Sequence, residues 1–317
     1  MKIITHNGDF HSDELLAVAA LRIYYGREQC EIIRTRDPEV IATGDVVVDV
    51  GYVYDPETKH FDHHQKEGAG VHDNGIPHSS LGLVWKHYGE LICGDSESAR
   101  IVKEKIVYPI DAADNGILVF AQTRNDVFPY IFHSLVASLR PTWKEIEEGT
   151  RTHDAGFFEA LEIAEQILRR EILVAQHMHE GAERIRAAHA QSPYKHIILL
   201  DGHYPMEAVA HEYPEVLYVV KPDKQNPHLW KVKTVRDNAH TFINRKDLPL
   251  AWAGKTNEAL QAVTGVADAV FCHVTRFIAI ARSQEGALAL ARMAVDEPSQ
   301  QMEELIVENN SAVVASA

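Results

Sequence analysis

Three short apolar runs alternate with two helical patterns in the first 50 residues of this chain. We interpret residues 3–5, 31–34 and 45–49 as strands, with one helix from Asp13 and a second after Asp37. The third run is continuously apolar, which is typical of a strand in a parallel sheet covered on both faces. The order β-α-β-α-β therefore predicts an α/β domain with a doubly wound, mainly parallel sheet.

A second series of strand-like runs follows a helical pattern over residues 154–190, which we interpret as one long helix or two. The pattern predicts strands at residues 197–200, 216–220, 230–235, 269–273 and 277–281, with helices at 257–263 and 285–295. We therefore predict a larger domain at residues 1–190, a smaller α/β domain at 191–300 and a flexible tail at 301–317.

Composition narrows the classes of function that fit the chain. Its 317 residues suffice for two domains, and its formal net charge of −15 disfavours binding to long duplex nucleic acid. The charge fits divalent cations that neutralise carboxylates, a small or short single-stranded substrate, or solubility alone. No apolar run reaches the roughly 18 residues of a membrane span, and the N-terminus lacks a signal-peptide pattern. Because the three cysteines are also scattered, we expect a cytoplasmic protein that does not contact a membrane.

Histidine and aspartate residues follow the predicted strands of the first domain. They are His6, His11, Asp13, Asp49 and the triplet Asp62-His63-His64. Because the carboxyl ends of parallel strands meet at one edge of a sheet, we expect these side chains to converge there. Imidazole and carboxylate groups bind divalent ions of the manganese type, and two such ions about 3.5–4 Å apart clamp a phosphoryl group. Asp49, at the end of a buried strand, is the natural carboxylate bridge.

Each of these residues also has a plainer explanation. A single His or Asp in a loop is more commonly a helix cap or a solvated side chain: His11 and Asp13 could begin a helix, and Asp49 could cap a turn. The triplet is harder to explain in this way, because placing it beside a buried strand costs desolvation free energy unless something binds it. The combination of these features within 65 residues favours the metal site.

Two further aspartates, Asp111 and Asp114, are spaced three apart and share a helix face. One of them could supply the last metal ligand while the other supports it or caps the helix before Gly116. We favour Asp111 as the ligand and keep Asp114 as the alternative.

The order of these motifs resembles that of the DHH phosphoesterase superfamily, which includes exonucleases, oligoribonucleases and manganese-dependent pyrophosphatases. Further segments across the chain are THNGDFHSDELLA, RTRDPE, VVVDVG, YDPETKHFDHHQ, IPHSSLGLVWKHYG, IDAADNGI, LPLAWAGKTNEAL and FCHVTRFIAIARSQEGALALA. Together they carry a closer resemblance, to the melanocyte-proliferating-gene exonuclease family, that covers nearly the whole chain.

This resemblance implies a DHH-like catalytic domain, two bound manganese ions, with magnesium as an alternative, and a set of metal ligands. The implied ligands are His6, His11, Asp13, Asp49, His63 and Asp111. His64 would face the substrate in catalysis, and Asp62 would orient the histidines. The superfamily usually has a second aspartate where this chain has His11, which favours a transition metal over magnesium.

The smaller domain resembles the substrate-binding domain of DHH enzymes, although it lacks their Gly-Gly-Gly-His signature. Its candidate phosphate contacts are Arg236, His273, Arg276 and Arg282, because guanidinium groups match phosphate oxygens. We therefore predict a two-metal phosphodiesterase, a 3′–5′ exonuclease on short single-stranded RNA or DNA, with a homodimer among its possible assemblies. The alternatives are hydrolysis of a small phosphate compound, such as a dinucleotide or pyrophosphate, and metal-dependent nucleotide binding without catalysis.

Overall fold

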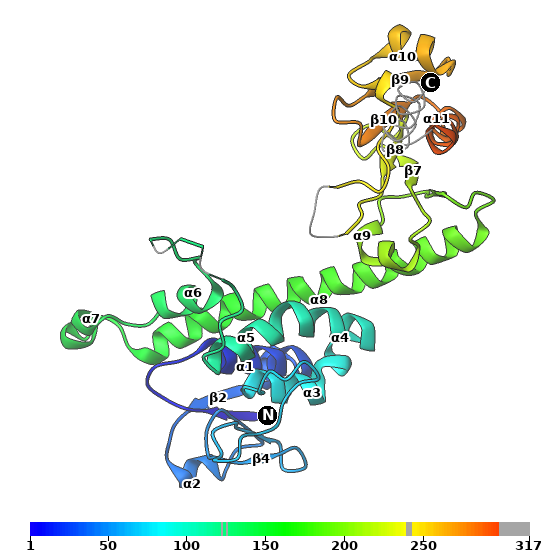
Figure 1. The fold of residues 1–317 in the computed structure, drawn as a ribbon. Helices are drawn as coiled ribbons and strands as arrows, with labels where there is room; N and C mark the ends of the chain where they lie inside the picture. Colours follow the sequence, from blue (N-terminus) through cyan, green and yellow to red (C-terminus); the bar gives the residue numbers. More distant parts are fainter. Residues whose placement is uncertain (122, 125, 239–242, 298–317) are drawn as a thin grey trace, which may run out of the picture. The chain divides into compact units, whose positions relative to one another are not determined.

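The computed structural model describes the chain except residues 122, 125, 239–242 and 298–317. It comprises two compact units, Met1–His177 and Met178–Ala317, each with its own sheet (Figure 1). The division falls within a long helix, α8 (His153–Gln191), and the boundary predicted after residue 190 falls at the end of the same helix. The tail predicted at residues 301–317 lies outside the described residues.

The first unit contains a five-stranded sheet in the order β2-β1-β3-β5-β4. Its strands are β1 (Lys2–Thr5), β2 (Glu31–Arg34), β3 (Val46–Val48), β4 (Tyr54–Asp55) and β5 (His60–Phe61). Strands β2, β1, β3 and β5 pair in parallel, and only β4 pairs antiparallel, with β5. The carboxyl ends of β1, β3 and β5 therefore lie at one edge of the sheet.

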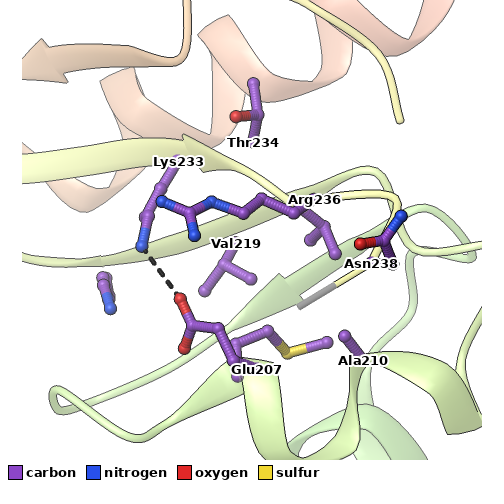
Figure 2. Close-up of a pocket in the computed structure, with 10 residues that line it drawn as sticks. Glu207, Ala210, Val219, Lys233, Thr234, Arg236 and Asn238 are labelled. Atoms are coloured by element: carbon purple, nitrogen blue, oxygen red, sulfur yellow. Dashed lines mark hydrogen bonds and ion pairs between the residues drawn. The ribbon is translucent and has the colours of Figure 1, made fainter. Parts of the chain in front are cut away.

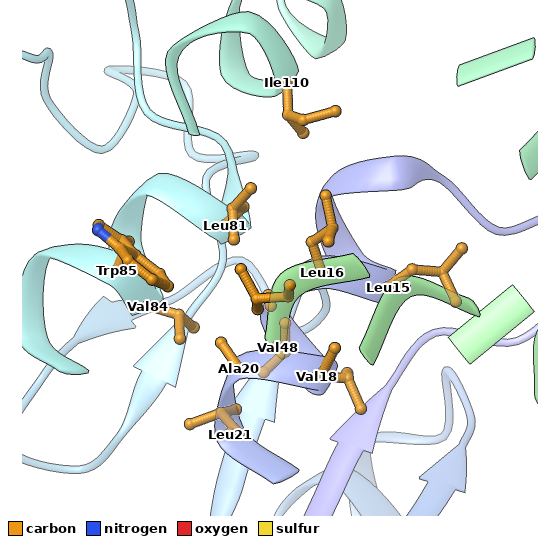
Figure 3. Close-up of a cluster of buried hydrophobic side chains, with 14 of the residues drawn as sticks. Leu15, Leu16, Val18, Ala20, Leu21, Val48, Leu81, Val84, Trp85 and Ile110 are labelled. Atoms are coloured by element: carbon orange, nitrogen blue, oxygen red, sulfur yellow. The ribbon is translucent and has the colours of Figure 1, made fainter. Parts of the chain in front are cut away.

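Helices cover both faces of this sheet because successive side chains of a strand point to opposite sides. Ile3 and Val48 join a large core with α1 (Ser12–Tyr25), α3 (Ser80–Cys93) and α5 (Tyr108–Asp114). Figure 3 shows Val48 beside side chains of α1 and α3 in this core. Ile4 and Val47 point the other way and pack with the short helix α2 (Pro38–Ile41).

The first unit has further helices, some of which add side chains to this core. They are η1 (Arg27–Gln29), α4 (Ser96–Val102), the π-helical turn η2 (Lys103–Val107), α6 (Phe132–Ser138), α7 (Trp143–Glu148) and α8. The first half of α8 buries Phe157, Leu161 and Leu168 in the same core as α1. Burying each such side chain contributes about 1.5–3 kcal/mol to the free energy of unfolding.

The second unit contains a five-stranded sheet in the order β6-β7-β8-β10-β9. Its elements are β6 (Ile197–Leu199), α9 (Met206–Val209), η3 (Ala210–Glu212), β7 (Tyr218–Pro222), β8 (Trp230–Thr234), η4 (Leu250–Trp252), α10 (Asn257–Thr264), β9 (Ala269–Cys272), β10 (Ile278–Ala281) and α11 (Gln284–Asp296). Only β6 and β7 pair in parallel. Helix α11 packs Ala287, Leu290 and Ala291 into the core of this unit.

The predicted fold class is confirmed: the first unit is a doubly wound α/β domain with a mainly parallel sheet, and the second is a smaller α/β unit. The strand patterns of the second unit predicted its strands but left their pairing open. Across the described residues, every helix is too short or too polar to cross a membrane.

Candidate metal centre

The loop between β1 and α1, residues 6–11, is held in place by two arginines from other elements. Arg34 of β2 donates to the Gly8 carbonyl at 2.8 Å, and its guanidinium lies 4.3 Å from the centre of the Phe157 ring. Arg140 donates to the Phe10 carbonyl at 2.9 Å. Gly8 itself has φ +85°, a conformation that glycine adopts without strain. The loop therefore presents its histidines from a fixed backbone.

His6, directly after β1, is buried and points one ring nitrogen at two carboxylates. Its Nδ1 lies 3.1 Å from the Asn7 carbonyl, to which it can donate. Its Nε2 contacts the Glu14 carboxylate and lies 3.3 Å from Asp49 Oδ2. A proton on Nδ1 leaves the Nε2 lone pair directed at the carboxylates, the arrangement that metal-binding histidines use.

Asp49, directly after β3, lies between histidines from two different strand ends. Its φ of +57° turns the chain sharply at the sheet edge, in a conformation that aspartate tolerates better than most residues. Oδ2 faces His6, whereas Oδ1 lies 3.4 Å from His63 Nε2 and accepts a hydrogen bond of 2.8 Å from Ser80 Oγ. Each carboxylate oxygen thus faces a different imidazole, as the bridge between two cations would require.

His63 extends the cluster towards α1 and α5. Its Nε2 lies 3.3 Å from Asp114 Oδ2 and 4.0 Å from Asp13 Oδ2. Ligand atoms of His11, Asp13 and Asp114 lie within 4.8 Å of one another. Neither carboxylate oxygen of Asp13, which is 1% exposed, accepts a hydrogen bond from the described residues. A buried carboxylate without partners is costly, and a cation would remove that cost.

The electrostatics of the cluster reflect this crowding of negative charge. Burial raises the pKa of Asp13 well above its usual range, and the carboxylates of Asp49 and Asp114 raise it further. Burial likewise raises the pKa of Glu14 to about 7, against the opposing effect of His6. Burial lowers the pKa of His6, but hydrogen bonds and charge from Asp49 and Glu14 outweigh it and raise the value to about 10. Without a cation, burial and mutual repulsion therefore favour the protonated forms of Asp13 and Glu14.

Asp62 holds His64, and both line a cavity of about 150 Å³. The His64 ring Nδ1 lies 2.7 Å from Asp62 Oδ1, which also accepts from the His64 backbone N–H, while Asp62 Oδ2 accepts from the Tyr52 N–H at 2.6 Å. The hydrogen bond to Asp62 raises the pKa of His64. His64 is half exposed, and the exposed Arg36 lines the same cavity.

Asp111 is not among the residues that the structure gathers at Asp49. Its carboxylate lies with His72 and His78, whereas the alternative ligand, Asp114, lies beside His63. The two aspartates are nearly one turn apart on α5, and their side chains reach different histidines. The structure thus brings Asp114, and not Asp111, into the cluster of predicted ligands.

Among the predicted phosphate contacts of the second unit, Arg236 lines a basic pocket (Figure 2). Lys221 and Lys233 line the same pocket, and Lys233 pairs with Glu207 at 3.2 Å. Lys221 forms no ion pair within the described part of the chain, and burial together with the charge of Lys233 lowers its pKa. Such a pocket favours an anion.

The other predicted contacts lie elsewhere in the second unit. Arg276 donates to Asp247 Oδ2 at 2.9 Å and to the Leu248 carbonyl at 3.3 Å, so it holds local structure. The His273 ring Nδ1 lies 2.8 Å from Thr275 Oγ1 in the turn between β9 and β10, and Arg282 is exposed directly after β10.

Sequence reasoning missed Glu14, Arg36, Lys221 and Lys233. Glu14 reads as one of two acidic residues at a helix start, where carboxylates are common without any ligand. The sequence did offer a signal, because Glu14 directly precedes the apolar residues 15–21 of α1, all of which are buried. A carboxylate in such a stretch needs a partner. The lysines of β7 and β8 read as ordinary exposed positions of alternating strands.

The donor set fits divalent metal ions. It combines imidazole nitrogens and carboxylate oxygens, Asp13, Glu14 and Asp49 are buried, and Asp13 accepts no hydrogen bond from the described residues. The fold and this site together define a class of protein: an α/β protein with a candidate divalent-metal site at the carboxyl edge of a mainly parallel sheet.

Residues 2–295 match the MYG1 exonuclease family, described as "Uncharacterised protein family (UPF0160)". The human MYG1 exonuclease is 31% identical over 335 residues, which cover 94% of this chain and 86% of the human protein. The MYG1 protein of Schizosaccharomyces pombe is 30% identical over 322 residues, covering 94% and 98% of the two chains. This chain belongs to the MYG1 exonuclease family.

Among solved structures, a manganese-bound exonuclease RecJ aligns with 95% of this chain and 92% of its own, at 14% identity and a TM-score of 0.27. RecJ from Thermus thermophilus in complex with Mn²⁺ aligns with 94% of this chain and 52% of its own, at 16% identity and a TM-score of 0.28. Likenesses this weak support no inference about the chemistry of the site.

Proposed function

We propose that this protein is a metal-dependent phosphodiesterase that removes nucleotides from the 3′ end of short single-stranded RNA or DNA. The observation that carries the proposal is the pair of histidines, His6 and His63, that face opposite oxygens of Asp49. A carboxylate placed in this way can join two cation sites. The family's name, and that of its human member, adds the exonuclease reaction.

Two manganese ions would share Asp49, with magnesium as a weaker fit because imidazole suits transition metals. His6 and Glu14 would hold one ion, and His63 and Asp114 the other, while His11 and Asp13 contribute from the side of α1. When bound, such ions offset charge on the phosphoryl oxygens and activate the attacking water. Asp114 takes the place in this set that sequence reasoning gave to Asp111.

His64, which is half exposed and lines the cavity, supplies a positive group for the phosphate. Asp62 accepts a hydrogen bond from Nδ1 and fixes the ring, so Nε2 is free to donate towards a phosphoryl oxygen or a leaving group. Because Asp62 raises the pKa of His64, the imidazolium form persists closer to neutral pH. Arg36, which lines the same cavity, adds a second cation for the developing negative charge.

The basic pocket of the second unit is the proposed contact for a further phosphate of the nucleic-acid backbone. An anion between Lys221, Lys233 and Arg236 would offset the repulsion that lowers the pKa of Lys221. Contacts to phosphate carry no sequence information, so this pocket fits a nuclease without base preference.

The proposal is tested with 5′-labelled and 3′-labelled single-stranded RNA and DNA of about ten nucleotides, incubated with the full chain and Mn²⁺. We expect a ladder of 5′-labelled products that shortens with time, because cleavage proceeds from the 3′ end. Asp13→Asn should abolish the ladder, whereas His228→Ala, a change to an exposed histidine of the second unit, should not.

Equal cleavage by wild type and Asp13→Asn would contradict the proposed centre. Turnover of a dinucleotide or pyrophosphate far above that of RNA and DNA would favour the small-substrate hydrolase. Nucleotide binding with Mn²⁺ but without any product would favour the non-catalytic alternative.

A further inference from the structure

A second cluster of buried ligand-type side chains lies in the first unit, apart from the group at Asp49. His72 Nε2 lies 2.6 Å from Asp111 Oδ2 and 3.1 Å from His78 Nδ1, and His78 Nδ1 lies 3.9 Å from the same carboxylate oxygen. All three residues are buried, with exposures of 8%, 5% and 0% for His72, His78 and Asp111. Three donor atoms thus converge on one point inside the protein.

We propose that His72, His78 and Asp111 form a separate site for a first-row transition metal ion, with zinc as the best fit. The three donor atoms form a triangle with edges of 2.6, 3.1 and 3.9 Å. The mean of these edges is close to the edge length of a zinc-centred tetrahedron. Zinc–nitrogen bonds of about 2.0–2.1 Å give tetrahedral edges of about 3.3 Å. Two imidazoles and one carboxylate leave a fourth position for water.

The hydrogen bonds around Asp111 leave one oxygen for the ion. Oδ1 accepts from Ser79 Oγ at 2.6 Å and from the Gly82 backbone N–H at 3.1 Å. Oδ2 faces only the two histidine rings, and no Lys or Arg pairs with Asp111 among the described residues. A fully buried carboxylate without a cationic partner is costly, and a divalent ion supplies the missing charge.

Protons on the two histidines satisfy the three donor atoms less well than a cation does. His78 Nδ1 lies 3.1 Å from His72 Nε2, so only one of the two rings can place a proton between these nitrogens. His72 Nε2 faces both a carboxylate oxygen and the nitrogen of His78, and a single proton between them serves one of the two contacts well. A cation satisfies all three donor atoms at once.

The backbone is shaped to let these groups converge. A Cβ on Gly82 of α3 would lie 1.9 Å from Asp111 Oδ2 and 2.8 Å from His78 Nδ1, so only glycine fits there. On the outer side, His72 and His78 line a cavity of about 380 Å³ that also contacts Lys86 and Lys103. The fourth position of the ion can therefore be reached by solvent.

The ion's role is to fix the segment of residues 70–79 against α3 and α5. This segment is closed by a bridge between Val71 and Pro77, and otherwise has little regular structure. Because Asp111 and Asp114 share α5, fixing Asp111 also fixes the position from which Asp114 reaches His63. The zinc site thus positions Asp114 for the metal centre at Asp49, which we call the main centre. Metal binding at the zinc site does not depend on the proposed nuclease reaction.

The test measures zinc by elemental analysis after the full chain has been exposed to Zn²⁺ and freed of unbound metal. The test uses a background protein that carries Asp13→Asn and Asp49→Asn, two changes that disable the main centre. We expect about one zinc ion per chain in this background and a fall of at least about tenfold after His72→Ala with His78→Ala. His228→Ala in the same background is the matched control and should keep its zinc.

A zinc content near zero in the background protein, or an unchanged content after both histidine changes, would overturn the proposal. If the histidine variant fails to fold, crystals of the wild-type chain soaked in Zn²⁺ give the answer through anomalous scattering at the zinc edge. A peak between His72 Nε2, His78 Nδ1 and Asp111 Oδ2 is expected, and its absence at a site with ordered side chains would refute the inference. Neither measurement depends on nuclease activity, so the two proposals can fail independently.

Discussion

The two units concentrate opposite charges, and they do so in different kinds of structure. In the first unit, buried carboxylates and imidazoles meet where β1, β3 and β5 of a parallel sheet end. In the second, Lys221 and Lys233 project from neighbouring antiparallel strands into a partly open pocket. Chemistry at a metal needs donor atoms fixed to a few tenths of an ångström, which burial provides. Holding a phosphate needs mainly positive charge, which tolerates looser geometry.

Asp49→Asn, a change in the first unit, should have the largest effect on activity. The change removes the negative charge that both histidines face while keeping the shape of the side chain, so we expect kcat for oligonucleotide cleavage to fall more than about 100-fold. Steady-state kinetics with Mn²⁺ check this, with His228→Ala as the control. A fall of less than about tenfold would mean that the centre of the first unit does not carry the reaction.

Asp114→Asn and Asp111→Asn form a matched pair on one helix. Asp114 lies 3.3 Å from His63 Nε2, so its loss should lower kcat about 100-fold, whereas Asp111→Asn should cost about tenfold because Asp111 only positions the helix. The same kinetic assay compares them. A larger loss for Asp111 would restore it as the ligand predicted from sequence.

Removing the metal should lower the free energy of unfolding of the first unit. Mn²⁺ at about 100 times its dissociation constant should add about 2.7 kcal/mol to the free energy of unfolding, or roughly 5–10 °C in Tm. Asp13→Asn should raise the Tm of the metal-free protein, because it removes a carboxyl group that burial makes costly to ionise, and should reduce the shift caused by Mn²⁺. Thermal unfolding with and without chelator measures both, and equal shifts in the two proteins would argue against Asp13 as a ligand.

Lys221→Ala should have the smallest effect, and one of a different kind. We expect KM for oligonucleotides to rise about tenfold at unchanged kcat, and the slope of log KM against log salt to fall by about one. Lys231→Ala is the control, since Lys231 pairs with Asp223 and is not among the described residues that line the pocket. A loss in kcat instead of KM would place Lys221 with the reacting groups and remove the contrast between the units.

Prediction from sequence worked best for histidines and aspartates that closely follow the end of a strand. The strand at residues 31–34 has the predicted bounds, and the long helix over 154–190 differs by one residue at each end. His6, His11, Asp13, Asp49 and His63 come together as expected because the ends of parallel strands must meet. Prediction failed to separate Asp111 from Asp114, because helical spacing says that they are neighbours but not which histidine each one meets.

The sequence by itself determined the alternation of strands and helices, and with it the edge at which histidines and aspartates gather. These properties follow from periodicity and local turn chemistry, which act over a few residues. Only the tertiary structure decided that Glu14 joins His6, that Asp114 joins His63, and that Asp111 joins His72 and His78. Those choices depend on how α1, α3 and α5 pack around the sheet, and packing is set by contacts between residues far apart in the chain.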